Sequence, residues 1–320
     1  MGRPSDDVSA LIAEVSDGGR PRAVARLISL IEDRSPQIRQ ISAGLAASSG
    51  RAHVVGITGS PGVGKSTSTS ALVGALRAAG RRVGVLAVDP SSPFTGGALL
   101  GDRIRMQDHA TDDGVYIRSM ASRGHLGGLS ASAPQALRVF DAAGCDVVLV
   151  ETVGVGQSEV EISGIADTSV VLLAPGMGDG IQAAKAGILE IGDIFVINKA
   201  DRDGANTTRR EIRTVISMTD RTPDAWVPPV VMTVATKSEG AADLVEQIEA
   251  HREHLESSGE LQRRRLARVR REIEALALSE VQNRFEQRSG GSDLDALSAQ
   301  VLGGQIDPFT AADHLIAELG

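Results

Sequence analysis

The chain has 320 residues, a formal net charge of −8, one cysteine and six histidines. This length allows a large α/β domain with additional helices. The acidic balance argues against a nucleic-acid binder, which is more often basic. Cys145, as the single cysteine, excludes an internal disulfide and a multi-cysteine metal site, which fits a reducing compartment. No apolar run reaches membrane-spanning length and the amino terminus lacks an apolar signal region, so we expect a cytoplasmic protein without a membrane partner.

Residues 1–50 are predicted to form an N-terminal helical extension, because residues 8–47 carry apolar side chains at helical spacing. Residues 51–255 alternate short apolar runs with helical patterns. The runs are continuous, as in strands that are covered on both faces. The predicted strands cover residues 53–58, 83–88, 115–119, 146–151, 169–174, 194–198 and 230–234. This order predicts an α/β fold with a doubly wound, mostly parallel sheet, and makes Cys145 a small buried residue before the fourth strand.

Residues 256–320 are predicted to form a C-terminal helical arm, because a long charged helix here carries an apolar stripe. The stripe consists of Leu261, Leu266, Val269, Ile273, Leu276 and Phe285. An arm outside the sheet must bury this stripe, so we expect a partner subunit and hence a homodimer. The arginines at 263–271 are interpreted as a solvated face with pairs four residues apart, Arg268–Glu272 and Arg270–Glu274, and not as a nucleic-acid site.

The loop after the first predicted strand fits the phosphate-binding pattern G-x-x-x-x-G-K-[ST] and precedes a helical stretch, so it predicts a nucleoside triphosphate site. Its glycines let backbone N–H groups turn toward phosphate oxygens, Lys65 can reach the β- and γ-phosphates, and the Ser66 hydroxyl can ligate Mg²⁺. The predicted residues are Gly59, Ser60, Pro61, Gly62, Val63, Gly64, Lys65, Ser66 and Thr67.

Asn198-Lys199-Ala200-Asp201 follows the sixth predicted strand and matches the N-K-x-D pattern by which GTPases recognise guanine. The Asp201 carboxylate can accept hydrogen bonds from the ring N–H and the exocyclic amine of guanine, whereas adenine offers no such pair of donors. The pattern therefore predicts GTP and GDP as ligands. Lys199 would lie along the base, and Asn198 would join this loop to the phosphate loop. A further loop, Val234, Ala235 and Thr236, is expected to lend a backbone N–H to guanine.

Glu151-Thr152-Val153-Gly154 ends the fourth predicted strand, where small GTPases have D-x-x-G. Glu151 can hold Mg²⁺ through a water, and the Gly154 N–H can sense the γ-phosphate, so the next segment should be ordered by GTP. Val155 stands where Ras-type proteins have the glutamine that positions water, and the nearest glutamine is Gln157. We therefore expect slow intrinsic hydrolysis unless a partner completes the site.

Two aspartates between the second and third predicted strands leave two interpretations open. Asp89 and Asp102 are candidates for the Mg²⁺ shell or for orienting water, because the carboxyl end of a strand faces the ligand crevice. Alternatively, Asp89 begins a turn and Asp102 caps a helix. A glycine-rich stretch at 174–180, before Gln182 and Lys185, is either a third mobile loop or an ordinary turn.

The motifs together closely resemble the MeaB/ArgK family of P-loop GTPases. They are G-S-P-G-V-G-K-S-T at 59–67, V-D-P-S-S-P-F at 88–94, S-R-G-H-L-G-G-L at 122–129, E-T-V-G-V-G-Q-S-E at 151–159 and N-K-A-D at 198–201. The resemblance implies a chaperone of adenosylcobalamin-dependent methylmalonyl-CoA mutase that gates cofactor loading, protects the mutase and helps to replace damaged cofactor. It also implies a homodimer through the arm, Asp89, Asp102 and Glu151 around Mg²⁺, and Gln182 and Lys185 on a third switch.

Three other functions are weighed against this one. A metal-insertion GTPase of the nickel type would carry clustered His or Cys ligands, but only His251 and His254 are close, on a helix face expected to be exposed. A small-molecule kinase would need an acceptor pocket with a base, and no feature indicates one. Direct cobalamin binding through His125 is not expected, because Arg123 replaces the aspartate that would orient the imidazole.

Overall fold

The computed structural model describes residues 7–48, 50–90, 109, 111–122, 132–152, 162–176, 189–288 and 292–317. Contacts divide the chain into two compact units, Met1–Arg265 and Leu266–Gly320. The division falls inside one long helix, α12 (Glu260–Arg288). The domain limits expected at residues 50 and 255 stay predictions.

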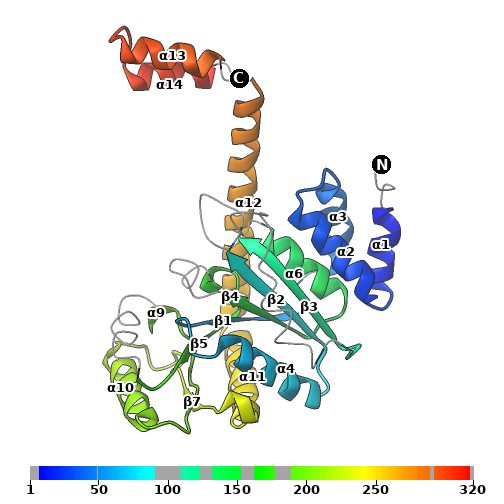
Figure 1. Cartoon of the computed structure of the whole chain (residues 1–320), viewed down its shortest axis with the longest axis vertical. Helices are drawn as coiled ribbons and strands as arrows, with labels where there is room; N and C mark the ends of the chain where they lie inside the picture. The colour runs from blue at the N-terminus through cyan, green and yellow to red at the C-terminus, as the bar shows by residue number, and fades with distance from the viewer. Residues whose placement is uncertain are drawn as a thin grey trace. The chain divides into compact units, whose positions relative to one another are not determined.

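The first unit is built on one sheet, in which seven parallel strands, counted over the described residues, have the order β3-β2-β4-β1-β5-β6-β7 (Figure 1). The strands are β1 (His53–Thr58), β2 (Val83–Pro90), β3 (Val115–Ser122), β4 (Val147–Thr152), β5 (Thr168–Leu173), β6 (Ile194–Ile197) and β7 (Val230–Met232). Every residue of β1, β4, β5 and β6 is buried, which explains the continuous apolar runs. The predicted fold class is confirmed.

Helices cover both faces of this sheet, because successive side chains of a strand point to opposite sides. Val54 joins a core with four helices on one face: α1 (Val8–Ser16), α2 (Pro21–Glu32), α3 (Ile38–Leu45) and α6 (Ala133–Ala142). Val55 joins the opposite core with α4 (Lys65–Ala78) and α11 (Ala241–Ser257). Helix α10 (Ala205–Met218) packs through Ile212 and Ile216 against β5 and β6.

The N-terminal helices form as the apolar spacing predicts. The Asp7 carboxylate accepts hydrogen bonds from the N–H groups of Ser9 and Ala10 and so caps α1. Gly19 has a φ of 64°, in the left-handed region, which lets the chain turn into α2. Leu27 and Ile28 of α2 are fully buried in the core beneath the sheet.

The second unit is helical in its described part. It contains the rest of α12, then α13 (Ser292–Leu302) and α14 (Pro308–Ala317). Among the described residues, the other short elements belong to the first unit and are η1 (Ala46–Ser48), η3 (Ile162–Gly164), α9 (Leu189–Ile191) and η5 (Ala235–Lys237). None of the helices in the described ranges is both long enough and apolar enough to cross a membrane.

Candidate nucleotide-binding site

The described residues of the predicted site gather at the carboxyl ends of strands on either side of β1, with β5 lying between β1 and β6. The phosphate loop follows β1, Glu151 lies in β4 on one side of β1, and Asn198 follows β6 on the other side of β5. The strand order reverses at β1, since β4 and β5 flank it. In doubly wound sheets, ligands bind in the crevice at such a reversal.

Three glycines of the phosphate loop have a positive φ, and two of them, Gly59 and Gly64, also lack room for a side chain. Gly59 has a φ of 144°, and a Cβ atom there would lie 2.3 Å from the Leu172 carbonyl oxygen. Gly64 has a φ of 95° and caps α4, and its Cβ would lie 2.5 Å from Asn198 Nδ2. A side chain at either position would therefore displace the backbone of the loop or the amide that holds it.

Lys65 is the first residue of α4, and its side chain folds back over the loop. Its Nζ donates hydrogen bonds to the carbonyl oxygens of Gly59 at 2.6 Å and Ser60 at 3.3 Å. The ammonium group thus lies beside the loop that would receive a phosphate chain, at the positive end of the α4 dipole.

Ser66 and Glu151 meet beneath this loop. The Ser66 hydroxyl donates to Glu151 Oε1 at 2.7 Å, and both side chains are buried. Glu151 pairs in register with Ile57 of β1, which brings the carboxylate to the helix start. A hydroxyl and a carboxylate are oxygen ligands of the kind that Mg²⁺ prefers, so the two residues fit a magnesium site.

Several predicted residues cannot be placed in this geometry. Asp89 lies in β2, and its backbone pairs with Ala121 of β3, but its side chain is outside the described part. Asp102, Gly154, Val155, Gln157, Gln182, Lys185, Arg123 and His125 lie outside the described residues.

Asn198 joins the predicted guanine loop to the phosphate loop. Its Nδ2 donates to the Val63 carbonyl oxygen at 2.8 Å, and its Oδ1 accepts from the Thr233 hydroxyl at 3.2 Å and the Ala235 N–H at 3.1 Å. Asn198 is 3% exposed. Lys199, whose φ is 57°, adds a second link by donating from Nζ to the Gly62 carbonyl oxygen at 2.7 Å.

The residues predicted to contact the base differ in exposure, since Val234 and Ala235 are buried, at 7% and 8% exposed. The Asp201 side chain is exposed, and so is Thr236, in the short helix Ala235–Lys237. Val234 forms an antiparallel bridge with Glu239, which closes this loop into a tight turn. Thr233, which orients Asn198, was not predicted; the available signal was a hydroxyl residue at the end of β7, next to the expected loop.

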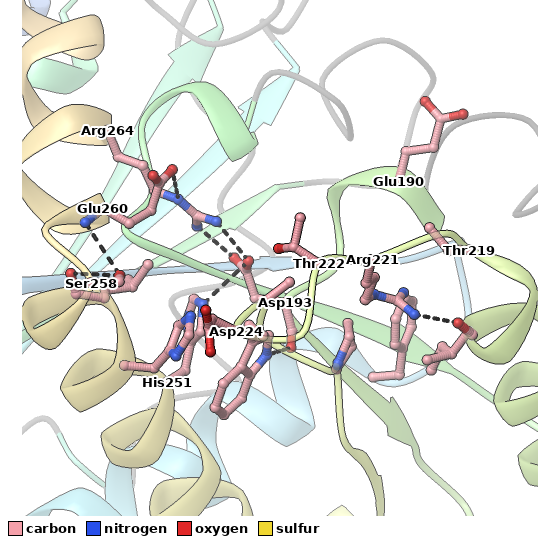
Figure 2. A pocket seen from close by; sticks show the side chains of 18 of the residues that line it. Glu190, Asp193, Thr219, Arg221, Thr222, Asp224, His251, Ser258, Glu260 and Arg264 are labelled. Carbon is pink, nitrogen blue, oxygen red and sulfur yellow. Dashed lines mark hydrogen bonds and ion pairs between the residues drawn. The ribbon is translucent and has the colours of Figure 1, made fainter.

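A separate cavity of about 720 Å³ lies away from these loops (Figure 2). Its wall includes His251, and here the sequence-based expectation was wrong, because His251 is fully buried. Its Nδ1 lies 2.8 Å from Thr168 Oγ1, its Nε2 lies 3.4 Å from Asp193 Oδ1, and its ring packs on Trp226. The charged pattern of the helix did not predict these contacts, because the partners lie far away in the sequence.

The arginines at the start of α12 also differ from the predicted solvated face. Arg264 donates to both carboxylate oxygens of Asp193 at 3.0 and 3.1 Å, and Arg265 donates to Asp167 Oδ2 at 2.8 Å. Both aspartates are buried or nearly so, with side chains 12% and 0% exposed. Solvated pairs also occur, at the helix start in Arg263–Glu260 at 2.7 Å and further along in Arg270–Glu274 at 3.1 Å.

The described residues hold no group of three or more His, Cys, Asp or Glu side chains that could bind a metal ion together. Cys145 is buried as predicted, and burial raises the pKa of its thiol to about 12. It is therefore an unreactive core residue.

Comparison with known proteins gives consistent matches. The family model described as methylmalonyl Co-A mutase-associated GTPase MeaB matches residues 24–289. A putative GTPase of Pyrococcus abyssi is 47% identical over 98% of this chain and 97% of its own length. The GTPase ArgK of Escherichia coli is 39% identical over 76% of each chain. A crystal structure titled LAO/AO transport system kinase has 28% identity and a TM-score of 0.72 over 100% of this chain and 99% of that one.

Proposed function

The chain belongs to the MeaB family of GTPases, and from this premise we propose that it is a chaperone of adenosylcobalamin-dependent methylmalonyl-CoA mutase. It would gate the loading of the cofactor, protect the mutase and assist its reactivation, with GTP hydrolysis as the timer. The observation that carries the proposal is the direct link of a phosphate loop to an N-K-A-D loop through Asn198. A mouse relative, 35% identical over 82% of this chain and 64% of its own length, is named methylmalonic aciduria type A homolog, which supports the same client.

The proposed nucleotide site is supported by the contacts of Lys65, Ser66 and Asn198. Lys65 would turn from the Gly59 carbonyl oxygen to the β- and γ-phosphates, and the helix start would supply N–H groups. Asp201 would accept two hydrogen bonds from guanine while Lys199 lies along the base. Ser66 and Glu151, together with Asp89 and Asp102, would hold Mg²⁺, which neutralises charge on the phosphates when bound.

Hydrolysis would be slow in the isolated protein. Water must attack the γ-phosphorus in line with the departing GDP, and catalysis depends on positioning this water and stabilising charge. Val155 cannot orient a water as a glutamine does. Binding of the mutase would complete the site, and Gln182 and Lys185 are the candidate residues that respond to it. Whether GTP or GDP is bound would therefore depend on the mutase. A cytoplasmic location for the protein stays a prediction.

Homodimer formation through the arm is part of the proposal. Leu266 is 67%, Ile273 61% and Leu276 51% exposed, and these residues share one face of α12. A second copy would cover this face. Ile273→Asp should turn a dimer into a monomer in light scattering after size exclusion, whereas Ala275→Asp, on the opposite face, should stay dimeric. A monomeric wild type would reject this part of the proposal.

Capture of the client tests the proposed function. The purified protein, loaded with GDP or a non-hydrolysable GTP analogue, is used as bait for a cell extract, and bound proteins are identified by mass spectrometry. We expect a cobalamin-dependent mutase to be retained to a different extent with the two nucleotides. Repeated captures without any such mutase would contradict the proposal. One tight nickel or zinc site per dimer would instead support the metal-insertion alternative.

A further inference from the structure

The amino-terminal edge of the sheet, opposite the nucleotide loops, holds a buried chain of polar side chains. His53 Nε2 lies 2.8 Å from Thr168 Oγ1, and the same oxygen lies 2.8 Å from His251 Nδ1. His53 is 1% exposed, and the other two side chains are fully buried. One threonine hydroxyl therefore bridges two imidazole rings from β1 and α11 out of contact with water.

The outer nitrogen of each ring faces an aspartate. His53 Nδ1 lies 3.9 Å from Asp167 Oδ2, and His251 Nε2 lies 3.4 Å from Asp193 Oδ1. Neither nitrogen makes a hydrogen bond of good geometry within the described part of the chain. Burial lowers the pKa of both histidines to about 4, so both rings are neutral at pH 7. A neutral ring has one N–H donor and one acceptor nitrogen.

Two neutral imidazole rings joined by one hydroxyl can form their hydrogen bonds in two directions, because the Thr168 hydroxyl has one proton. In the first, His53 Nε2–H donates to Thr168, Thr168 donates to His251 Nδ1, and His251 Nε2–H points at Asp193. In the second every donor is reversed, and His53 Nδ1–H points at Asp167. Both rings carry the proton on Nε2 in the first arrangement and on Nδ1 in the second. The shorter contact to Asp193 favours the first.

The two aspartates connect these hydrogen-bonded side chains to the start of α12. Asp193 binds Arg264 through both oxygens, and Asp167 binds Arg265. In each hydrogen-bond direction, a histidine N–H points toward only one of the two aspartates. A reversal therefore changes which aspartate, and so which arginine's partner, receives a histidine N–H. A buried network with two complete donor patterns is a two-state element.

Two residues of this network stand at the starts of the strands that lead to the nucleotide loops. His53 begins β1, which runs into the phosphate loop, and Asp193 directly precedes β6, which runs to Asn198. A change in the spacing of these strands changes the distances across Thr168, at the first position of β5. We propose that His53, Thr168 and His251 form a two-state relay that couples the nucleotide site to the first turns of α12. This rests on guanine nucleotide binding and does not require the mutase.

Histidine NMR tests the relay in the intact protein. With ¹⁵N-labelled imidazoles there are only six rings, and their nitrogen shifts report the tautomer. We expect His53 and His251 to carry the proton on the same nitrogen, Nε2, in the nucleotide-free protein. Saturation with a GTP analogue and Mg²⁺, verified by calorimetry on the same sample, should move both rings together and leave His314 unchanged. Opposite tautomers, or two unchanged rings at saturation, would overturn the proposal.

Two variants give an independent readout through Trp226, the single tryptophan of the chain, whose ring centre lies 4.8 Å from that of His251. Thr168→Val removes the bridging hydroxyl, and Thr168→Ser keeps it. The change in Trp226 emission on nucleotide binding should persist in the serine variant and disappear in the valine variant. A folded valine variant with the full emission change would contradict the relay. The wild-type NMR result decides the matter where the valine variant does not fold, and mutase capture tests the proposed function separately.

Discussion

Asn198 uses both ends of its side-chain amide to hold two loops together. Nδ2 donates to Val63, and Oδ1 accepts from Thr233 and Ala235, all at a position that is 3% exposed. Replacing the amide would deprive the Val63 carbonyl, the Ala235 N–H and the Thr233 hydroxyl of this partner, at about 1–3 kcal/mol for each buried group left unsatisfied. Asn198, with Lys199 as a second link to Gly62, therefore holds the predicted base-binding loop against the phosphate loop.

Asp201 provides the sharpest test of base recognition at the level of a residue. Asp201→Asn replaces an acceptor carboxylate by an amide and should lower GTP affinity about 100-fold, because two hydrogen bonds to a charged group are lost. XTP, which presents a carbonyl in place of the exocyclic amine, should bind the variant better than GTP does. Competition with a fluorescent guanine nucleotide measures both. Asp203→Asn, at an exposed site outside the motif, is the control, and unchanged GTP affinity in Asp201→Asn would refute the assignment.

His251 shows why single residues were harder to predict than motifs. Its neighbours in the sequence are charged, so the local pattern indicates an exposed helix face. Its partners, Thr168 and Asp193, come from the starts of two strands distant in the chain. No local spacing encodes such contacts, whereas the phosphate loop is contiguous and carries its own geometry in its glycines.

At the level of elements, the strands were predictable because burial on both faces leaves a run of apolar residues. β6, Ile194–Ile197, is completely buried, and its sequence is a continuous apolar run. The first turn of α12 was not predictable in the same way. Arg264 and Arg265 pair with Asp193 and Asp167, before β6 and β5, although Arg264 also pairs along the helix with Glu260. The charged residues are visible in the sequence, but their positions at one edge of the sheet are seen only in the structure.

Removing Arg264 should destabilise the first unit. Its partner Asp193 is 12% exposed, so Arg264→Ala leaves a largely buried carboxylate without its bidentate donor. Loss of a buried partner costs several kcal/mol, and partial exposure of the pair reduces this to about 2–3 kcal/mol. Arg270→Ala, whose pair with Glu274 is solvated, should change the free energy of unfolding by less than about 0.5 kcal/mol. Urea denaturation compares the two, and equal losses would contradict a specific anchor.

The amino edge of the sheet should also make stability depend on pH. His53 and His251 have pKa values near 4 in the folded chain against an ordinary value of 6.5. The unfolded chain therefore binds protons first as the pH falls below 6.5, and stability is lost from there to about pH 4. Each histidine contributes at most about 1.4 kcal/mol per pH unit in this window. Urea denaturation at pH 7.5, 6.5, 5.5 and 4.5 measures the loss, and equal stability at pH 7.5 and 4.5 would contradict it.

At the level of the whole molecule, a nucleotide-binding sheet is joined to a charged helix whose apolar face is exposed. The fold and the order of its motifs were predictable, because the phosphate loop, Glu151 and the Asn198 loop each follow or end a buried strand. The attachment of the helix was not, because it depends on Asp167 and Asp193 meeting arginines about 70 to 100 residues away. Asp89 and Asp102 keep both of their interpretations.

The most direct measurement of the central claim is GTP turnover with a purified client. Phosphate release is followed with the protein alone, with a cobalamin-dependent methylmalonyl-CoA mutase, and with the mutase plus the Lys65→Ala variant as a control for contaminating hydrolysis. A partner-completed site predicts slow turnover alone, a rise of about tenfold or more with the mutase, and none with the variant. Turnover that is unchanged by the mutase at saturating concentration would contradict the proposed chaperone function.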